Sequence, residues 1–188
     1  MKKVFTGMLL VLLTASLVAN AQQTAQQPDK WINYTSPEGR YSVSFPEQPK
    51  LKTQESATAD GEKFPQYLAL ASDAQITFLV GYFDVAPGSI FSGDLARDAM
   101  VKKVAGNLIS ERGITLGAIP GRDLNVELKL SVPTAEGEPA RQTEYVDRMR
   151  MYEANKRVYI LQAFFPKTAE TEAAARVTKY FDSFQVKN

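Results

Sequence analysis

Short segments in which apolar and polar residues alternate recur along this 188-residue chain, with turns between them. Residues 41–45 (YSVSF) alternate and stop at Pro46, and residues 123–130 (DLNVELKL) place four apolar side chains on one face. A period of two is typical of a β-strand with one buried face. Further strands are expected over residues 66–71, 75–85, 142–152 and 157–165. The chain is therefore predicted to consist mainly of about six strands.

The connections between these strands are short, and this determines how the strands pair. Residues 153–156 (EANK) join two predicted strands directly, and Ser72 and Asp73 join two others. Hairpin connections of this length require antiparallel pairing. Residues 75–85 carry apolar side chains on both faces, so both faces are covered and this strand is expected to be central in the sheet.

Two segments follow the period of an α-helix. Ser92 or Asp94 can cap the first helix, and Thr168 can cap the second. The expected buried stripes are Val101, Val104, Ala105 and Leu108 in the first helix and Ala173, Val177, Tyr180, Phe181 and Phe184 in the second. The predicted fold class is α+β: a mostly antiparallel β-sheet of about six strands flanked by helices on both faces, an α/β/α sandwich.

The N-terminal residues have the composition of an export signal. Lys2 and Lys3 precede an apolar run over residues 4–18, and Ala19-Asn20-Ala21 has the small-x-small pattern that signal peptidase cleaves. We expect residues 1–21 to be a signal peptide cleaved after Ala21, residues 22–29 (QQTAQQPD) a flexible linker, and residues 30–188 a single domain. The expected location is periplasmic or secreted.

The chain contains no histidine and no cysteine. This excludes Ser-His-Asp and Cys-His nucleophile systems, thiol redox pairs, zinc fingers and histidine metal sites. Acid–base catalysis would need a carboxylate or lysine with a strongly shifted pKa. We therefore expect no enzymatic activity, no catalytic residue, no metal and no cofactor.

The charge of the expected mature chain does not favour nucleic acid. Loss of residues 1–21 removes Lys2 and Lys3 and no acid, so 22 basic residues become 20, against 21 acidic ones, a net charge of −1. A phosphate backbone demands a clearly basic surface. No nucleic-acid partner is expected, and membrane contact is expected only if the N-terminal segment stays uncleaved.

The segments that carry a family resemblance are residues 31–46 (WINYTSPEGRYSVSFP), 117–123 (GAIPGRD), 148–152 with 159–161, and 180–184 (YFDSF), and they are spread over nearly the whole predicted domain. Together they resemble PsbP-like proteins. The resemblance is to bacterial exported PsbP-related proteins, and it implies an antiparallel sheet sandwiched by helices and a non-catalytic role. The metal-binding histidines proposed in the photosynthetic branch have no counterpart here, because the chain has no histidine.

One pair of arginines is a candidate interaction patch. Arg148 and Arg150 lie two residues apart in a predicted strand, so their side chains share one face, and Arg141 and Arg157 are candidates to lie nearby. Such a patch can bind a carboxylate or a partner's acidic surface, because a guanidinium offers paired donors. Glu144 shares the face, so cross-strand ion pairs are the competing interpretation.

Two hypotheses for function remain. The first is an exported non-catalytic accessory or protein-interaction domain whose partner is an unknown protein of the cell envelope. The alternative is a periplasmic small-ligand-binding protein that uses a pocket between sheet and helix. The closest pair of carboxylates on a predicted helix, Asp94 and Asp98, is better explained by helix capping than by glycosidase chemistry.

Overall fold

The computed structural model describes residues 3–5, 30–58, 61–73, 75–132 and 140–187. Apart from residues 3–5, the expected signal peptide and linker lie outside the described residues, so both stay predictions. Strand β1 (Lys3–Phe5) pairs in parallel with β7 (Ser89–Phe91).

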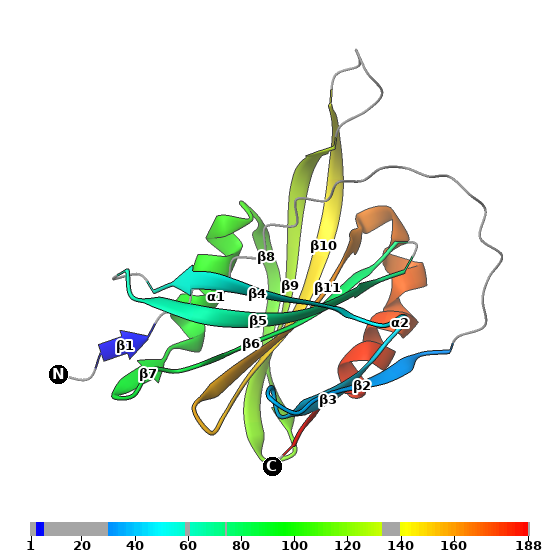
Figure 1. Cartoon of the computed structure of the whole chain (residues 1–188). Helices are drawn as coiled ribbons and strands as arrows, with labels where there is room; N and C mark the ends of the chain where they lie inside the picture. The colour runs from blue at the N-terminus through cyan, green and yellow to red at the C-terminus, as the bar shows by residue number, and fades with distance from the viewer. Residues whose placement is uncertain (1–2, 6–29, 59–60, 74, 133–139, 188) are drawn as a thin grey trace.

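A seven-stranded antiparallel sheet forms the body of the molecule, in the order β4-β5-β6-β11-β10-β9-β8 (Figure 1). Its strands are β4 (Lys50–Ala57), β5 (Lys63–Ser72), β6 (Thr77–Asp84), β8 (Asn107–Leu116), β9 (Ile119–Val132), β10 (Arg141–Ala154) and β11 (Arg157–Pro166). A three-stranded sheet consists of β12 (Gln185–Val186), β3 (Tyr41–Phe45) and β2 (Ile32–Ser36). The predicted mostly antiparallel α+β architecture is confirmed, and β6 lies inside the sheet as expected.

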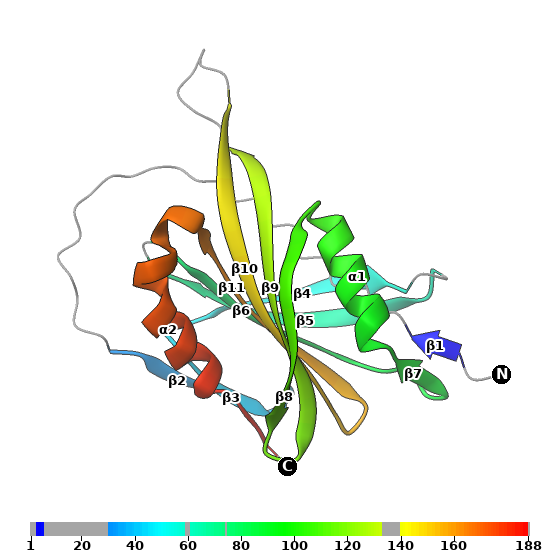
Figure 2. The same cartoon turned by 180° about the vertical axis from the view of Figure 1, so that it is seen from behind.

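The helices are α1 (Gly93–Lys103) and α2 (Glu170–Asp182), and a short 3-10 turn, η1 (Lys167–Ala169), precedes α2. In both views α1 and α2 lie on either side of β9 and β10 (Figures 1 and 2). They contribute to two different groups of buried side chains. Val158 and Ile160 of β11 pack in the cluster that contains Ala96 and Met100 of α1.

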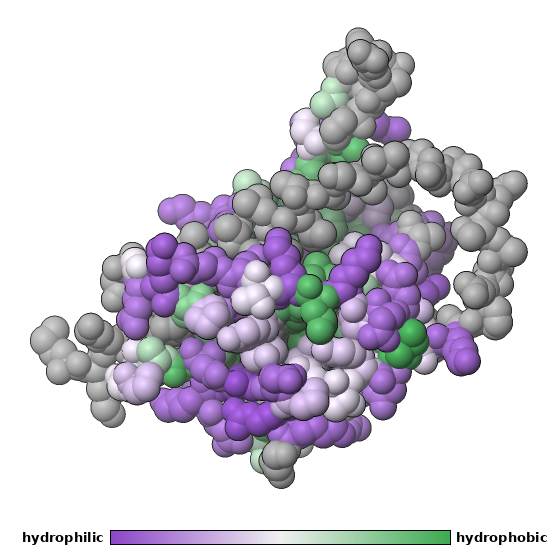
Figure 3. All heavy atoms as spheres, viewed as in Figure 1, coloured by the Kyte–Doolittle hydropathy of each residue, from purple (hydrophilic) through white to green (hydrophobic). Residues whose placement is uncertain are grey.

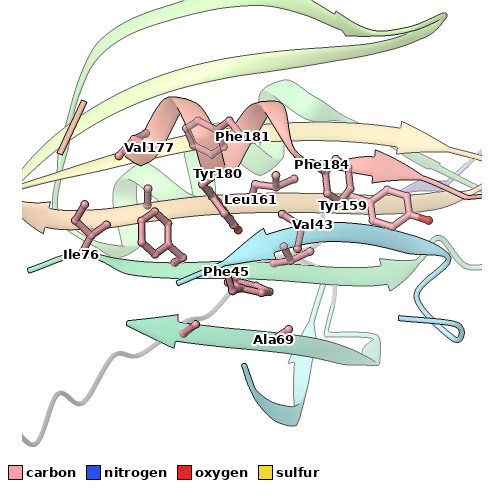
Figure 4. Packing of buried hydrophobic residues seen from close by; sticks show 14 of the residues in the cluster. Val43, Phe45, Ala69, Ile76, Tyr159, Leu161, Val177, Tyr180, Phe181 and Phe184 are labelled. Carbon is pink, nitrogen blue, oxygen red and sulfur yellow. The ribbon is translucent and has the colours of Figure 1, made fainter. Parts of the chain in front are cut away.

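The larger buried cluster lies on the other face of β11. Tyr159 and Leu161, which alternate with Val158 and Ile160, pack in the cluster that contains the buried residues of α2. Because neighbouring residues of a strand point to opposite faces, the two clusters occupy opposite sides of the sheet. Figure 4 shows side chains of α2 and of β3 meeting over the strands of this larger cluster.

Helix α2 has the buried stripe that its spacing predicts. The five residues of the stripe are all buried, although Phe184 lies just beyond the end of the helix. The predicted cap is wrong: Ala169 occupies the N-cap position and makes no side-chain cap hydrogen bond. Thr168 lies instead inside the 3-10 turn, where the backbone N–H of Glu170 donates to the carbonyl of Lys167. A backbone hydrogen bond therefore replaces the side-chain cap.

Helix α1 is capped as predicted but is shorter than predicted. The Ser92 hydroxyl accepts a hydrogen bond from the backbone N–H of Leu95 at 3.4 Å. The helix ends at Lys103, because Ala105 has a left-handed φ of 47° and the N–H of Gly106 turns back to the carbonyl of Val101. The predicted stripe is right only in part: Val101 and Val104 are half-buried and pack against the cluster of Ala96 and Met100, whereas Ala105 and Leu108 lie beyond the helix and are exposed.

Candidate functional site

The two predicted patch residues converge on a buried acid. The guanidinium of Arg150 lies 3.3 Å from the carboxylate of Asp123 on β9, and that of Arg148 also lies 3.3 Å from it. A third arginine, Arg112 on β8, donates to the same carboxylate at 2.9 Å. We call Arg112, Arg148 and Arg150, together with Asp123, the arginine cluster.

Strand register places these residues together. Asp123 lies directly opposite Arg150 on β10 and directly opposite Arg112 on β8. Arg148 lies opposite Asn125, two positions along the same face. Directly opposed side chains in antiparallel strands are close enough to interact, so three adjacent strands bring three arginines to one acid.

The side chain of Asp123 is 3% exposed, and its ionisation depends on the arginines. Burial alone would raise its pKa, but hydrogen bonding from Arg112 and the charges of Arg148 and Arg150 outweigh burial and hold the pKa below its usual value. The carboxylate is therefore ionised at neutral pH and fixes the arginines in place.

The three arginines differ in how firmly the fold holds them. Arg150 also pairs with Asp182 of α2 at 3.2 Å, and its guanidinium lies 4.7 Å from the centre of the Phe181 ring. By contrast, the side chains of Arg112 and Arg148 are 68% and 33% exposed. Three arginines face the two carboxylates of Asp123 and Asp182, so the cluster and Asp182 together carry one net positive charge.

The other residues considered with the patch lie elsewhere. Glu144 pairs with Lys129 at 3.3 Å, which is a cross-strand pair outside the cluster. Arg157 lies on β11 and pairs with Asp84 of β6, and Arg141 is exposed at the start of β10. The predicted cross-strand ion pair exists for Glu144, but its partner is a lysine of β9 rather than Arg148 or Arg150.

Sequence reasoning did not identify Asp123 and Arg112 as members of the site. Asp123 alternates with apolar residues, which predicts a side chain on the solvent face, and residues 107–116 lack the regular alternation that predicts a strand. Only the register of β8 and β10 against β9 shows that both residues belong to the arginine cluster. The interaction patch itself stays a prediction.

A second candidate site is a pocket of about 420 Å³ beside the β2–β3 hairpin. We call it the tyrosine pocket. Its lining residues come from strands and turns, whereas the sequence hypothesis placed a ligand pocket between sheet and helix. The lining residues are Tyr34, Ser36, Glu38, Tyr41, Leu51, Lys52, Thr53, Tyr67, Leu68, Tyr82, Asp84 and Arg157.

Arg157 fastens one wall of the tyrosine pocket to the sheet. Its Nε and Nη2 atoms donate to the carboxylate of Asp84 at 2.6 and 2.7 Å, and its Nη1 donates to the carbonyl of Glu38. The hydroxyl of Tyr159 donates to the carbonyl of Gly39 at 2.9 Å. The turn between β2 and β3 is therefore tied to β11 at two successive carbonyls.

Replacing Arg157 with methionine should lower the free energy of unfolding by about 1.5–3 kcal/mol, the range for hydrogen bonds to charged groups. Because the Arg157 side chain is only 10% exposed, water cannot fully replace the hydrogen bonds that it donates. Urea denaturation measures the loss, with Arg141→Met at the exposed start of β10 as the matched control. Equal midpoints for the two variants would contradict this role of Arg157.

A wider pocket of about 670 Å³ lies at the start of α1. Glu111 of β8 accepts hydrogen bonds from Arg97 and Arg122 there, and Arg97 pairs with both Asp94 and Asp98. Burial opposes ionisation of Glu111, but the two arginines outweigh it and lower the pKa. The carboxylates at the start of α1 therefore pair with arginine.

Within residues 3–5, 30–58, 61–73, 75–132 and 140–187, no group of three or more metal-ligating side chains is arranged to hold a metal ion. In the same part of the chain, no helix combines the length and the apolar character needed to span a membrane. On the face seen in Figure 3, hydrophobic side chains form small separate areas among hydrophilic ones.

No model of a known protein family matches the chain, and no curated protein matches its sequence. Solved structures match its fold. The solution structure of cyanobacterial PsbP from Synechocystis matches with a TM-score of 0.57 at 9% identity, over 89% of this chain and 98% of that one. The yeast (Saccharomyces cerevisiae) Ran-binding protein Mog1p matches with a TM-score of 0.47 at 10% identity, over 83% of this chain and 95% of that one.

The match to cyanobacterial PsbP extends over almost the whole of that protein. At 9% identity it concerns the arrangement of strands and helices and carries no activity with it. The chain has a PsbP-like fold, as the sequence resemblance predicted.

Proposed function

We propose that this chain is an exported, non-catalytic accessory domain that binds a protein partner through the arginine cluster. The observation that carries the proposal is that three arginines, from the two strands beside β9, surround the buried carboxylate of Asp123. Asp123 neutralises one of these charges and holds the guanidinium groups in place.

The exposed members of the cluster suit a partner's carboxylates. Arg112 makes one hydrogen bond to Asp123, and most of its side chain is exposed. Arg148 makes one hydrogen bond to Asp123 through Nη2, and a third of its side chain is exposed. Arginine offers five donors in a planar fork, so both side chains have donors left for an acidic surface. Electrostatic complementarity of this kind contributes specificity and association rate.

The rest of the proposal rests on the sequence. Export follows from Lys2, Lys3, the apolar run and the Ala19-Asn20-Ala21 pattern, which places the partner in the cell envelope. The lack of histidine and cysteine supports a non-catalytic role without a cofactor, and the balanced charge disfavours nucleic acid. Membrane contact is proposed only for an uncleaved form.

The proposed architecture has a helix layer on each face of the sheet, and the buried residues of α1 and α2 support it.

A photo-crosslinking amino acid at Ser110 tests the proposal. Ser110 is exposed on β8, two residues before Arg112, so the crosslinker lies beside the cluster. In cells of the source organism we expect a reproducible crosslink to one envelope protein. The variant Arg112→Ala/Arg148→Ala should reduce its yield by roughly tenfold, which corresponds to about 1.4 kcal/mol.

The matched control removes the same charge from the opposite edge of the sheet. Lys50→Ala/Lys52→Ala changes two exposed lysines of β4 and should leave the crosslink intact. Arg150 is kept in both variants because it packs against Phe181. If both double variants lose the crosslink equally, or neither does, the arginine cluster does not bind the partner.

A further inference from the structure

We propose that the tyrosine pocket binds a neutral saccharide. This site is separate from the arginine cluster: the two share no residue. The proposal goes beyond partner binding, and either activity can fail without the other.

A stack of three planar groups forms one side of the pocket. The guanidinium of Arg157 lies 4.7 Å from the centre of the Tyr82 ring, and the Tyr82 and Tyr67 rings are stacked at 4.9 Å with an angle of 20° between their planes. Tyr82 is 6% exposed and Tyr67 is 38% exposed. The inner part of the stack is therefore fixed by the fold, and the outer ring is open to a ligand. The apolar C–H face of a sugar ring can pack on such a ring.

The edge of the pocket carries the polar groups that hydroxyls need. The carboxylate of Asp84 is 59% exposed and accepts hydrogen bonds, and Glu38 adds a second carboxylate. Thr53 adds a hydroxyl that can donate or accept. Every sugar hydroxyl is both a donor and an acceptor, so a mixed set of this kind suits a ring bearing several hydroxyls.

The charges around the pocket select for a neutral ligand. Lys52 and Arg157 balance Glu38 and Asp84, so the lining has no net charge. A charged ligand would find no net complementary charge there. A purely aromatic ligand would remove the charged groups from water and give them no hydrogen bond, which is costly. A neutral molecule rich in hydroxyls avoids both costs.

The pocket has the size and the rigidity of a ligand site. Its volume of about 420 Å³ lies within the range of about 300–1,000 Å³ typical of small-molecule sites. The turn that forms one wall is held by Arg157 and Tyr159 at the carbonyls of Glu38 and Gly39. A wall already held in place costs little entropy when a ligand binds.

Saturation-transfer NMR and calorimetry on the full chain test the proposal with maltohexaose, cellohexaose and chitohexaose. At least one of these neutral oligosaccharides should bind, with its ring C–H protons receiving the saturation. Tyr67→Ala should weaken binding by roughly tenfold or more, since it removes the open ring. Tyr67→Phe keeps the ring and should retain most of the affinity.

The matched control is Tyr145→Ala on β10, where the Tyr145 ring stacks on Phe164 at 4.8 Å outside the pocket. It should bind the sugar as the parent does, and so should Arg112→Ala/Arg148→Ala. The proposal is wrong if none of the three sugars binds, or if Tyr145→Ala weakens binding as much as Tyr67→Ala. It is also wrong if indole binds at Tyr67 and no sugar does.

Discussion

Replacing Phe181 with alanine should lower the free energy of unfolding by about 3–5 kcal/mol, a large share of the roughly 5–15 kcal/mol that stabilises a typical domain. Phe181 is 3% exposed and packs in the larger buried cluster between α2 and the sheet (Figure 4). Its ring lies 5.4 Å from that of Tyr180 and under the guanidinium of Arg150. Truncation removes these contacts and leaves a cavity that a packed core fills only in part.

Urea denaturation of Phe181→Ala measures this loss, with Thr178→Ala as the control. Thr178 is exposed on the same helix, so its replacement should change stability little. Phe181→Leu keeps part of the side-chain volume and should fall between the two variants. An unchanged midpoint for Phe181→Ala would show that α2 does not pack against the sheet as described.

The last helix was predictable because its pattern is local. Residues at positions i, i+4, i+7 and i+8 share one helix face whatever the rest of the chain does. The strands that alternate cleanly, such as residues 41–45, were predictable for the same reason. Helix α2 has the burial that its spacing predicts, and residues 41–45 form a strand, although Ser42 on its predicted polar face is buried as well.

The two strands of the large sheet that the sequence does not predict, β4 and β8, are its edge strands, and few of their side chains are buried. In β4 seven of the eight residues are exposed or partly buried, and β8 has no fully buried residue along its ten. Such segments lack the apolar alternation on which the prediction depends. Gly113 lies within β8, where an edge strand tolerates a glycine. The large sheet therefore contains five of the six expected strands together with β4 and β8, and the expected strand at residues 41–45 lies in the three-stranded sheet.

The arginine cluster shows which part of a site the sequence could not provide. The shared face of Arg148 and Arg150 follows from a period of two and needs no structure. Their partner, Asp123, depends on the register between β9 and β10, and no local pattern determines that register. A charged residue in an alternating strand is normally exposed, so its burial beside three arginines is a tertiary effect.

Asp147 is a buried acid that has no cationic partner among the described residues. Desolvation raises its pKa from 3.8 to about 7, and the hydrogen bond from Gln162 at 3.0 Å opposes this only in part. Its other oxygen has no hydrogen-bond partner among the described residues. The folded protein therefore binds this proton more tightly than the unfolded chain does.

Stability should fall as the pH rises through the interval between these two pKa values. From about pH 4 to about pH 7 the folded state retains a proton that the unfolded state has lost. The resulting decrease in the free energy of unfolding approaches roughly 4 kcal/mol. Asp84 and Asp123 act in the opposite sense, since their lowered pKa values favour the folded state once the pH exceeds the pKa of the unfolded chain. A comparison with a variant is needed to isolate Asp147.

Asp147→Asn removes the titrating group and keeps its shape. Near pH 4 we expect the variant and the parent to unfold at similar urea concentrations, because both side chains are then neutral. Near pH 8 the variant should be the more stable by as much as a few kcal/mol, because the parent must bury an unpaired carboxylate. Glu62→Gln, at an exposed acid, should show no such difference between the two pH values. If Asp147→Asn and the parent unfold at the same urea concentration at both pH values, the Asp147 carboxylate is not shielded from water. The described position of Asp147, buried between β9 and β11, would then be wrong.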